Sequence, residues 1–592
     1  MTTDQIILFT IFAGFFIVLL TGRWRYDMVA FVALLAGVLS GAVKTKDAFS
    51  GFGHPATIVV ALVLVVSAGL VRSGAVFLIT RSLIDASRKM GTHIAIMGGV
   101  GAVLSAFMNN VAALALLMPV DVQTARKAGR NPGATLMPLS FATILGGMVT
   151  LIGTPPNIII ASIRGEATGV PFKMFDFAPV GGITALAGLI FVAFVGWRLI
   201  PVQATKQGAA DQLSELSDYV AELIVPEKSA LIGQQLHMLY NEAEQADVAI
   251  LGLTRDGKRL AGTARNTALK AGDALVMEAA PDNLDEFRTT LKLEITDAAG
   301  KKLGVASDGL DIIEVVVPDS ARIEGRSAIA IGLRWRKRTV LLGISRKGTR
   351  ILQKVRNTQI QAGDILLLLV PHDAKDDIIN WLGCLPLEDR GLAVTQDTKT
   401  WLAISVFAAA VLAASFGWVY LPVALGVVVV VYVLLKILPL AEIYDHIEWP
   451  VVVLLGSMIP LGAALDQAGG TQLIANSLLG LTEGLPAWAV LTVLMVVTMT
   501  LSDVLNNTAT TIVAAPVAIA MADSLNASPD PFLMAVAVAA SCAFLTPIGH
   551  KNNTLVLGPG GYSFWDYWRM GLPLEILVIL VSIPSILVFW PL

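Results

Sequence analysis

The chain has 592 residues, of which 55% are hydrophobic and only 15% are charged, and its mean hydropathy is +0.72. A soluble protein carries about 25% charged residues, so this composition indicates a membrane protein and excludes a disordered chain or a disulfide-rich scaffold. The net charge is -3 and no basic tail is present, which excludes nucleic-acid binding as the main role.

The charges are concentrated in the middle of the chain. Residues 201–400 hold 53 of the 87 charged residues. We therefore predict a first membrane repeat (1–200), two inserted domains (201–300 and 301–395) and a second membrane repeat (396–592). The apolar run Ile6–Leu20 leads directly into the next span, so we expect a retained helix and not a cleaved signal peptide.

Ten segments are long and apolar enough to predict membrane helices, which need roughly 20 such residues. In chain order they lie near 5–21, 27–43, 56–72, 134–162, 177–197, 399–415, 422–439, 449–466, 530–556 and 571–591. The predicted fold class is an α-helical polytopic membrane protein with an inserted α+β part.

Two further apolar segments, 92–121 and 485–522, are interrupted by Asn-Asn pairs. Each arm of the first has only about 11–16 residues, which is too short to cross a membrane. Basic residues flank it on both sides, and basic loops favour the cytoplasm. They are Arg81, Arg88 and Lys89 before it, and Arg126, Lys127 and Arg130 after it. The flanks of the second segment (467–484 and 523–530) contain no Lys or Arg. We therefore predict two re-entrant hairpins that enter from opposite faces, with the insert on the cytoplasmic side.

The two membrane parts also resemble each other in sequence. Asn110 and Pro119 have the same spacing as Asn507 and Pro516, at an offset of 397 residues. Gly153–Asn157 corresponds to Gly549–Asn553 at an offset of 396 residues. Two ordered matches in opposite predicted orientation indicate inverted repeats, whose broken helices form the binding site in many transporters.

The interruptions predict a central site for an anion and a cation. Polar backbone survives in a bilayer only where protein or a water-filled cavity satisfies it. Free N–H groups at the start of a half-helix attract anions. Asn oxygens and unwound carbonyls can instead ligate a hard cation. The alternative is that the Asn pairs only join helices by hydrogen bonds.

These motifs resemble those of the divalent anion/sodium symporter family within the ion transporter superfamily. That family carries Ser-Asn-Thr at each hairpin tip and a Thr-Pro-Pro-Asn-like motif in each broken helix. Here the tips read Asn109-Asn110-Val111 and Asn506-Asn507-Thr508, and the broken helices read Thr154-Pro155-Pro156-Asn157 and His550-Lys551-Asn552-Asn553. The second broken helix resembles a branch with a cytoplasmic insert that includes sulfate permeases.

Candidate site residues follow from the resemblance and from ionisable residues inside the membrane. The candidate substrate-binding residues are Asn109, Asn110, Asn157, Asn506, Asn507, Thr508, Lys551 and Asn553. The candidate Na⁺ ligands are Asn110, Gly153, Asn507, Asp503 and Gly549. Lys551 and Asp503 are included because intramembrane charges are expensive and usually face a cavity or a partner. Alternatively, the two pair with each other, or Lys551 reaches the cytoplasmic surface. We expect His550 to be structural.

The insert is itself duplicated. Ala221–Pro226 matches Ile313–Pro318, and Ala271-Gly-Asp273 matches Ala362-Gly-Asp364, at offsets of 91 or 92 residues. Short β-rich runs with glycine turns predict strands. The pattern resembles two TrkA-C (RCK C-terminal) domains, near 214–290 and 305–382. Such domains dimerise and in some proteins sense a small molecule or a nucleotide; the alternative is a pure assembly module. The basic run Arg334–Arg338 suggests a solvated face or a contact with anionic lipid.

The predicted function is a secondary active transporter in the cell (inner) membrane. It is expected to work as a homodimer and to move a small anion, sulfate or another divalent oxyanion or dicarboxylate, by elevator-like symport with Na⁺ or H⁺. The alternatives are a cation/proton antiporter, for which Asp503 is the relevant residue, and a channel gated by the insert. No cofactor is expected besides Na⁺. An enzyme is not expected, because no phosphate loop or nucleophile elbow occurs.

Overall fold

The computed structural model describes most of the chain in two compact units. The described residues are 1–20, 24–75, 88–201, 220–239, 242–243, 248–255, 258–259, 267–278, 287–295, 310–319, 321–333, 337, 339–346, 349–351, 355–371, 374–387, 397–482 and 484–592. Arg81 and most of the basic run 334–338 lie outside them. One unit comprises residues 1–202, 389–556 and 563–592, and the other comprises 203–388 and 557–562.

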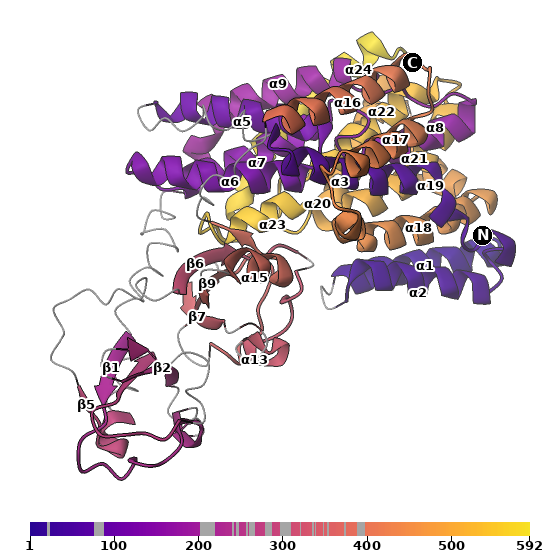
Figure 1. Ribbon diagram of the computed structural model, residues 1–592. Helices are drawn as coiled ribbons and strands as arrows, with labels where there is room; N and C mark the ends of the chain where they lie inside the picture. Colours follow the sequence, from indigo (N-terminus) through magenta and orange to yellow (C-terminus); the bar gives the residue numbers. More distant parts are fainter. Residues whose placement is uncertain are drawn as a thin grey trace. The chain divides into compact units, whose positions relative to one another are not determined.

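The first unit is helical (Figure 1). Its first half contains α1 (Thr3–Leu20), α2 (Tyr26–Leu39), α3 (Pro55–Arg72), α5 (Met90–Phe107), α6 (Asn110–Lys127), α7 (Gly133–Gly147), α8 (Pro155–Thr168) and α9 (Ala178–Phe194). Its second half contains α16 (Asp397–Ser415), α17 (Leu421–Leu434), α18 (Trp449–Gln467), α19 (Gly470–Leu481), α20 (Ala487–Val504), α21 (Asn507–Ser524), α22 (Pro529–Ser541), α23 (Lys551–Leu557) and α24 (Asp566–Phe589). Short 3-10 turns η1 (Thr45–Asp47), η2 (Ser50–Gly53) and η3 (Gly196–Leu199) lie in the first half, and η10 (Leu440–His446) lies in the second.

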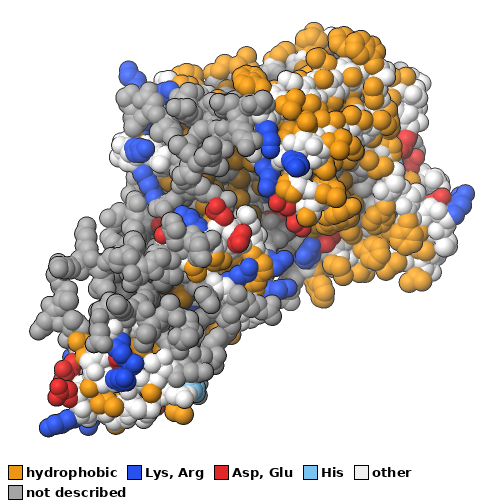
Figure 2. Space-filling view, in the orientation of Figure 1, with side chains coloured by type: hydrophobic (Ala, Val, Ile, Leu, Met, Phe, Trp, Pro, Cys, Tyr) orange, Lys and Arg blue, Asp and Glu red, His pale blue; other side chains and the backbone are white. Residues whose placement is uncertain are grey.

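The helical unit is built for a bilayer. Among the described residues, five helical segments are long and apolar enough to cross a membrane: Thr45–Arg72, Met90–Phe107, Trp449–Gln467, Ala487–Val504 and Asp566–Phe589. Figure 2 shows hydrophobic side chains covering much of the visible face of this unit. Large side chains such as Val430 and Leu580 point outward, as expected where lipid and not water is the solvent. The predicted class of α-helical polytopic membrane protein is confirmed.

The two halves repeat the same series of helices and interlock. α5 and α20 begin 397 residues apart, as do α6 and α21, whereas α7 and α22 begin 396 residues apart, as do α8 and α23. α2 of the first half packs against α18 of the second, and α17 of the second packs against α3 of the first. α9 likewise packs against α24. Each half therefore completes the other's core.

Two predicted spans are broken helices, and one helix was not predicted. Residues 148–154 separate α7 from α8, and residues 542–550 separate α22 from α23. α19 lies in a stretch that we expected to be a loop. It has only 12 residues, too few to be recognised as a span, and its N-cap residue Gly469 has a φ of 74°, which favours glycine. It packs against α21.

The second unit contains two antiparallel five-stranded sheets of identical topology. The first has β1 (Val220–Ile224), β2 (Ala249–Arg255), β3 (Lys258–Arg259), β4 (Ala274–Glu278) and β5 (Glu294–Ile295) in the order β3-β2-β4-β1-β5. The second has β6 (Leu310–Val316), β7 (Val340–Arg346), β8 (Thr349–Ile351), β9 (Ile365–Pro371) and β10 (Leu385–Pro386) in the order β10-β6-β9-β7-β8. Among its described residues, the second sheet is accompanied by α13 (Ala328–Ile331) and α15 (Lys375–Leu382). Each sheet has its own hydrophobic core.

The repeated Ala-Gly-Asp turn has a structural purpose in both sheets. Gly272 and Gly363 adopt φ angles of 80° and 83°, which favour glycine. Asp273 accepts two hydrogen bonds of 2.7 Å from the Arg255 guanidinium, and Asp364 accepts bonds of 2.9 and 2.8 Å from Arg346. Burial would raise the pKa of the Asp273 carboxyl, but the hydrogen bonds from Arg255 and from the Lys270 backbone outweigh it and lower the pKa. The identification of these sheets as TrkA-C domains stays a prediction.

Candidate anion and cation site

The first Asn of each pair caps the helix that follows the hairpin turn. Asn109 Oδ1 accepts a 2.8 Å hydrogen bond from the backbone N–H of Val111, and Asn506 Oδ1 accepts a 2.9 Å bond from that of Thr508. Replacing such a cap by Ala costs about 1 kcal/mol. Ser and Asn are both good N-caps, which explains how Asn can stand where the resembling family has Ser.

The two broken helices are built in the same way. Asn157 Nδ2 donates to the carbonyls of Met148 (3.2 Å) and Thr150 (2.9 Å). Asn553 Nδ2 donates to those of Ala543 (2.9 Å) and Thr546 (3.1 Å). These bonds satisfy carbonyls that the missing helical turns leave open.

Threonine hydroxyls attach each break to the hairpin of its own half. Thr150 Oγ1 donates to the Ala106 carbonyl, and Thr546 Oγ1 donates to the Asp503 carbonyl. Asn553 Oδ1 also accepts from Ser140 Oγ at 2.9 Å. The substrate contacts predicted for Asn157 and Asn553 stay predictions, and both amides hold the breaks in shape in this conformation.

Both hairpins hold the second break. From the first hairpin, the Asn110 carbonyl accepts a 3.2 Å bond from Asn552 Nδ2, and the Asn110 amide group lies 3.4 Å from His550 Nε2. From the second hairpin, Asp503 Oδ1 accepts a 2.9 Å bond from the backbone N–H of Leu545. The chain between Leu545 and Asn552 therefore contacts the tips of both hairpins, which brings the two halves together at one place.

Asn110 is buried beside the first break. Its Oδ1 accepts a 2.6 Å bond from Ser105 Oγ. Its amide group lies against Gly147, where a side chain would collide with it, and Gly153 in turn lies against the Gly147 backbone. The residue that corresponds to Gly147 in the second half is Ala543. Asn507 is half-buried, and its Oδ1 accepts from the Thr508 N–H at 2.8 Å.

Lys551 makes an ion pair that the sequence did not predict. Its Nζ lies 2.6 Å from Glu448 Oε2, and it also sits 5.8 Å from the centre of the Tyr26 ring. The other oxygen of Glu448 accepts a 3.3 Å bond from Asn109 Nδ2. The alternative in which Lys551 pairs with Asp503 is therefore not found.

Asp503 has a different charged neighbour, Glu575 of α24. The two side chains are 2% and 6% exposed, and their carboxyl groups accept hydrogen bonds from the neighbouring backbone N–H groups of Phe544 and Leu545. Glu575 Oε1 accepts a 3.3 Å bond from the backbone N–H of Phe544, next to the Leu545 N–H that Asp503 binds. Asp503 Oδ2 has no hydrogen-bond partner within the described part of the chain. Neither carboxyl is paired with a basic side chain among the described residues, and two such buried groups attract a cation.

Sequence reasoning missed Glu448 and Glu575. Glu575 lies inside a predicted span, so the rule that singled out Asp503 also applies to it. Glu448 directly precedes another span, where a charge is ordinary, and only the fold shows its partner.

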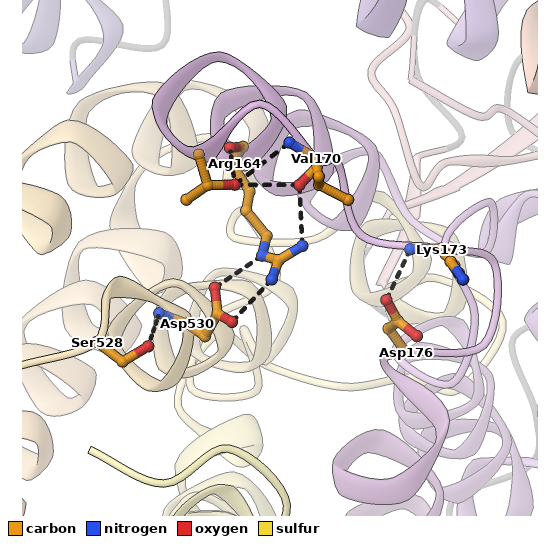
Figure 3. A network of polar contacts seen from close by, with 7 residues as sticks. Arg164, Val170, Lys173, Asp176, Ser528 and Asp530 are labelled. Atoms are coloured by element: carbon orange, nitrogen blue, oxygen red, sulfur yellow. Dashed lines mark hydrogen bonds and ion pairs between the residues drawn. The ribbon is translucent and has the colours of Figure 1, made fainter.

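An ion pair between the repeats lies away from this cluster. Arg164 of α8 binds both oxygens of Asp530 at the start of α22, at 2.7 and 2.8 Å (Figure 3). The same guanidinium donates to the Val170 carbonyl at 2.9 Å and lies 4.4 Å from the Phe172 ring centre. Such bidentate pairs are among the stronger polar contacts, and this one joins the broken helices of the two halves.

The polar atoms around the tips suit a hard cation. They are amide, hydroxyl, carbonyl and carboxylate oxygens, which are ligands for ions such as Na⁺ and not for soft transition metals. Within the described residues, no group of three or more His, Cys, Asp or Glu side chains is placed to hold a metal.

Comparison with known proteins agrees with this architecture. The model of the CitMHS family, described as citrate transporter, matches residues 16–539 and 486–592. An uncharacterized transporter of Synechocystis sp. is 30% identical over 94% of this chain and 92% of its own. The uncharacterized transporter YfbS of Escherichia coli is 27% identical over 96% and 97%. A probable sodium/sulfate cotransporter of Chlamydomonas reinhardtii is 26% identical over 61% and 42%. The chain therefore belongs to the citrate transporter family of the ion transporter superfamily, and is a membrane transporter of the divalent anion/sodium symporter type and not an enzyme.

Proposed function

We propose that the protein is a symporter that moves a small divalent anion, with sulfate as the first candidate, together with Na⁺. The observation that carries the proposal is that both hairpins bond to the second break, the first near His550 and the second, through Asp503, at Leu545, while Lys551 follows the break with a positive charge. The relative from Chlamydomonas reinhardtii named a sodium/sulfate cotransporter supports the choice of ions.

The anion is proposed to bind between Lys551 and the starts of α6 and α21. Both helices have 18 residues, and their first N–H groups attract negative charge. Asn109, Asn506, Asn507 and Thr508 lie at these starts and supply amide and hydroxyl donors. Asn157 and Asn553 support the site by holding the breaks open.

Na⁺ is proposed to bind on the two sides of the second break. On one side are Asn110 and the Gly153 backbone, which come from the first half. On the other side are Asp503, Asn507 and the Gly549 backbone; a side chain at Gly549 would collide with the Asp503 backbone. A cation held here reduces the repulsion between the anion and the two carboxyls, so that each ion favours binding of the other.

The remaining parts of the proposal concern assembly. Movement of the hairpins and broken helices relative to the flanking spans would give elevator-like alternating access. We place the protein in the cell membrane as a homodimer, with the insert in the cytoplasm as a dimerising or effector-sensing module.

The Asp503–Glu575 pair favours a second candidate, a cation/proton antiporter. Two adjacent buried carboxyls can exchange a shared proton for a metal cation. A pH change inside proteoliposomes on adding Na⁺ without any transported anion would identify this activity.

The test of the leading proposal is uptake of radioactive sulfate into proteoliposomes. An inward Na⁺ gradient should drive saturable accumulation in the wild type. Asn110→Ala and Asn507→Ala should abolish it while the proteins stay folded. Na⁺-driven uptake that is unchanged in both variants, or flux that does not saturate and needs no gradient, would refute the symporter.

A further inference from the structure

Glu448 occupies the N-cap position of α18, but its side chain does not cap this helix. At an N-cap, the shorter side chains of Ser, Thr, Asp or Asn accept from the helix's first N–H groups. The Glu448 side chain makes no such bond. Instead, one oxygen binds Lys551 at 2.6 Å and the other binds Asn109 at 3.3 Å. The carboxylate is thus turned away from α18 and toward the candidate site.

Both partners of Glu448 belong to the proposed anion site. Lys551 is the first residue of α23 and directly follows the second break. Asn109 caps α6, the second helix of the first hairpin. A carboxylate presents to them the same negatively charged acceptor oxygens that sulfate or a dicarboxylate would present. Lys551 therefore cannot give its full charge to a substrate anion while Glu448 holds it.

The two sides of this ion pair come from different parts of the chain. Glu448 is the N-cap residue of α18, which packs against α2 and also against α21 of the second hairpin, and Tyr26 of α2 lies beneath the Lys551 ammonium. Lys551 and Asn109 belong to the broken helix and the hairpin. The pair thus links a flanking span to the elements that hold the site.

We infer that Glu448 is a tethered anion that occupies the place of the substrate on Lys551 and Asn109 when the site is empty, and that the transported anion binds by displacing it. This inference rests on the proposed function. It assigns Glu448 two effects: it lowers the affinity for weak anions, and it ties the empty site to α18 until a suitable anion frees it.

The expected size of the effect follows from the exposure of the pair. The side chains of Lys551 and Glu448 are 25% and 33% exposed, so the pair is weaker than a fully buried one. The apparent dissociation constant equals the intrinsic one divided by the fraction of molecules whose site is open to the anion. Removing the competing Glu448 contact raises this fraction and lowers the apparent dissociation constant by the same factor. An ion pair of this exposure corresponds to about a two- to fivefold change.

The experiment measures sulfate binding to the full-length protein in nanodiscs by titration calorimetry, at constant Na⁺ with chloride as the balancing anion. Glu448→Gln should tighten sulfate binding about two- to fivefold, and Lys551→Gln should weaken it. The charge reversal Glu448→Lys with Lys551→Glu should restore thermal stability but not sulfate binding, because residue 551 then presents a negative charge to the anion and the lysine at 448 stands where the anion should bind.

A matched control is available in the same connecting segment. Glu442 of η10 pairs with Arg72, and Glu442→Gln removes an acid–base pair that lies outside the site. It should leave the sulfate dissociation constant unchanged. Glu448→Asp keeps the charge on a shorter side chain and should give an affinity between those of the wild type and Glu448→Gln. If Glu448→Gln does not fold, Glu448→Asp replaces it as the test variant.

The outcomes separate the two proposals. Unchanged or weaker sulfate binding in Glu448→Gln, or wild-type binding in the charge-reversed protein, would overturn the role of Glu448 even if the wild type transports sulfate. Tighter binding without Na⁺-driven uptake would keep the role of Glu448 and refute the symporter. If neither wild type nor Glu448→Gln binds sulfate, phosphate or succinate, both proposals fail.

Discussion

Replacing Gly147 by Ala should strongly reduce transport, although the substitution changes no polar residue of the site. An added Cβ would lie 2.9 Å from Nδ2 and 3.0 Å from Cγ of Asn110, and nearer still to Oδ1. Carbon contacts are comfortable at about 3.5–4.0 Å, so the amide must move by about 0.5–1 Å. That movement breaks the 2.6 Å bond from Ser105 and disturbs the contact with His550. A displacement of about 1 Å at a positioned group can cost about 100-fold in rate, so we expect Na⁺-driven sulfate uptake to fall at least tenfold.

The assay is initial-rate uptake in proteoliposomes, normalised to folded protein, with melting temperatures measured in parallel. Gly182→Ala is the matched control, because a Cβ at this site in α9 meets nothing within 4 Å. It should transport like the wild type. Gly147 has an ordinary helical backbone and is not among the glycines with positive φ, so the variant tests space and not backbone strain. Wild-type uptake by Gly147→Ala would contradict the claim that transport depends on the position of the Asn110 amide.

Three further predictions concern other parts of the chain. Asn157→Ala and Asn553→Ala should each lower the free energy of unfolding by about 2–4 kcal/mol, because two buried carbonyls lose their donors; thermal unfolding in detergent measures this, and exposed Asn476→Ala should have no effect. The lowered pKa of Asp273 stabilises its sheet above the unfolded pKa near 4, and this stabilisation is lost as pH falls through the folded pKa; the protection factors of β2 and β4 amides, which are corrected for the intrinsic exchange rate, should therefore fall as the pH drops below about 4 in the wild type and depend less on pH in Asp273→Asn. Burial raises the pKa of the Cys384 thiol to about 12, so maleimide should label this residue only on unfolding, and fast labelling of the native protein would contradict its burial.

The helix boundaries near the hairpins could be predicted from the sequence because they depend on local chemistry. Asn is a strong helix cap, and the two Asn-Asn pairs mark the starts of α6 and α21 at the same spacing. Gly and Pro likewise mark the two breaks. The duplicated insert was also visible, because strands and glycine turns repeat at a nearly constant offset. A short helix such as α19 carries no such local signal.

The charged contacts of the site could not be predicted, because they join residues that are far apart in the chain. Lys551 and Glu448 are separated by 103 residues, and Asn109 and Glu448 by 339. Local patterns identified Lys551 and Asp503 as ionisable residues whose burial in a membrane is energetically unfavourable, but did not show which partner each one has. The partners follow from how α18 and α24 pack, and packing depends on the whole fold.

The most direct measurement is a cryo-electron microscopy comparison of the protein in nanodiscs with sodium sulfate and with sodium chloride. We expect sulfate density in contact with Lys551 and close to both hairpin tips, with the Glu448 carboxylate moved off Lys551. Density for the anion away from the second break, or tips of α5–α6 and α20–α21 that do not meet there, would contradict this expectation.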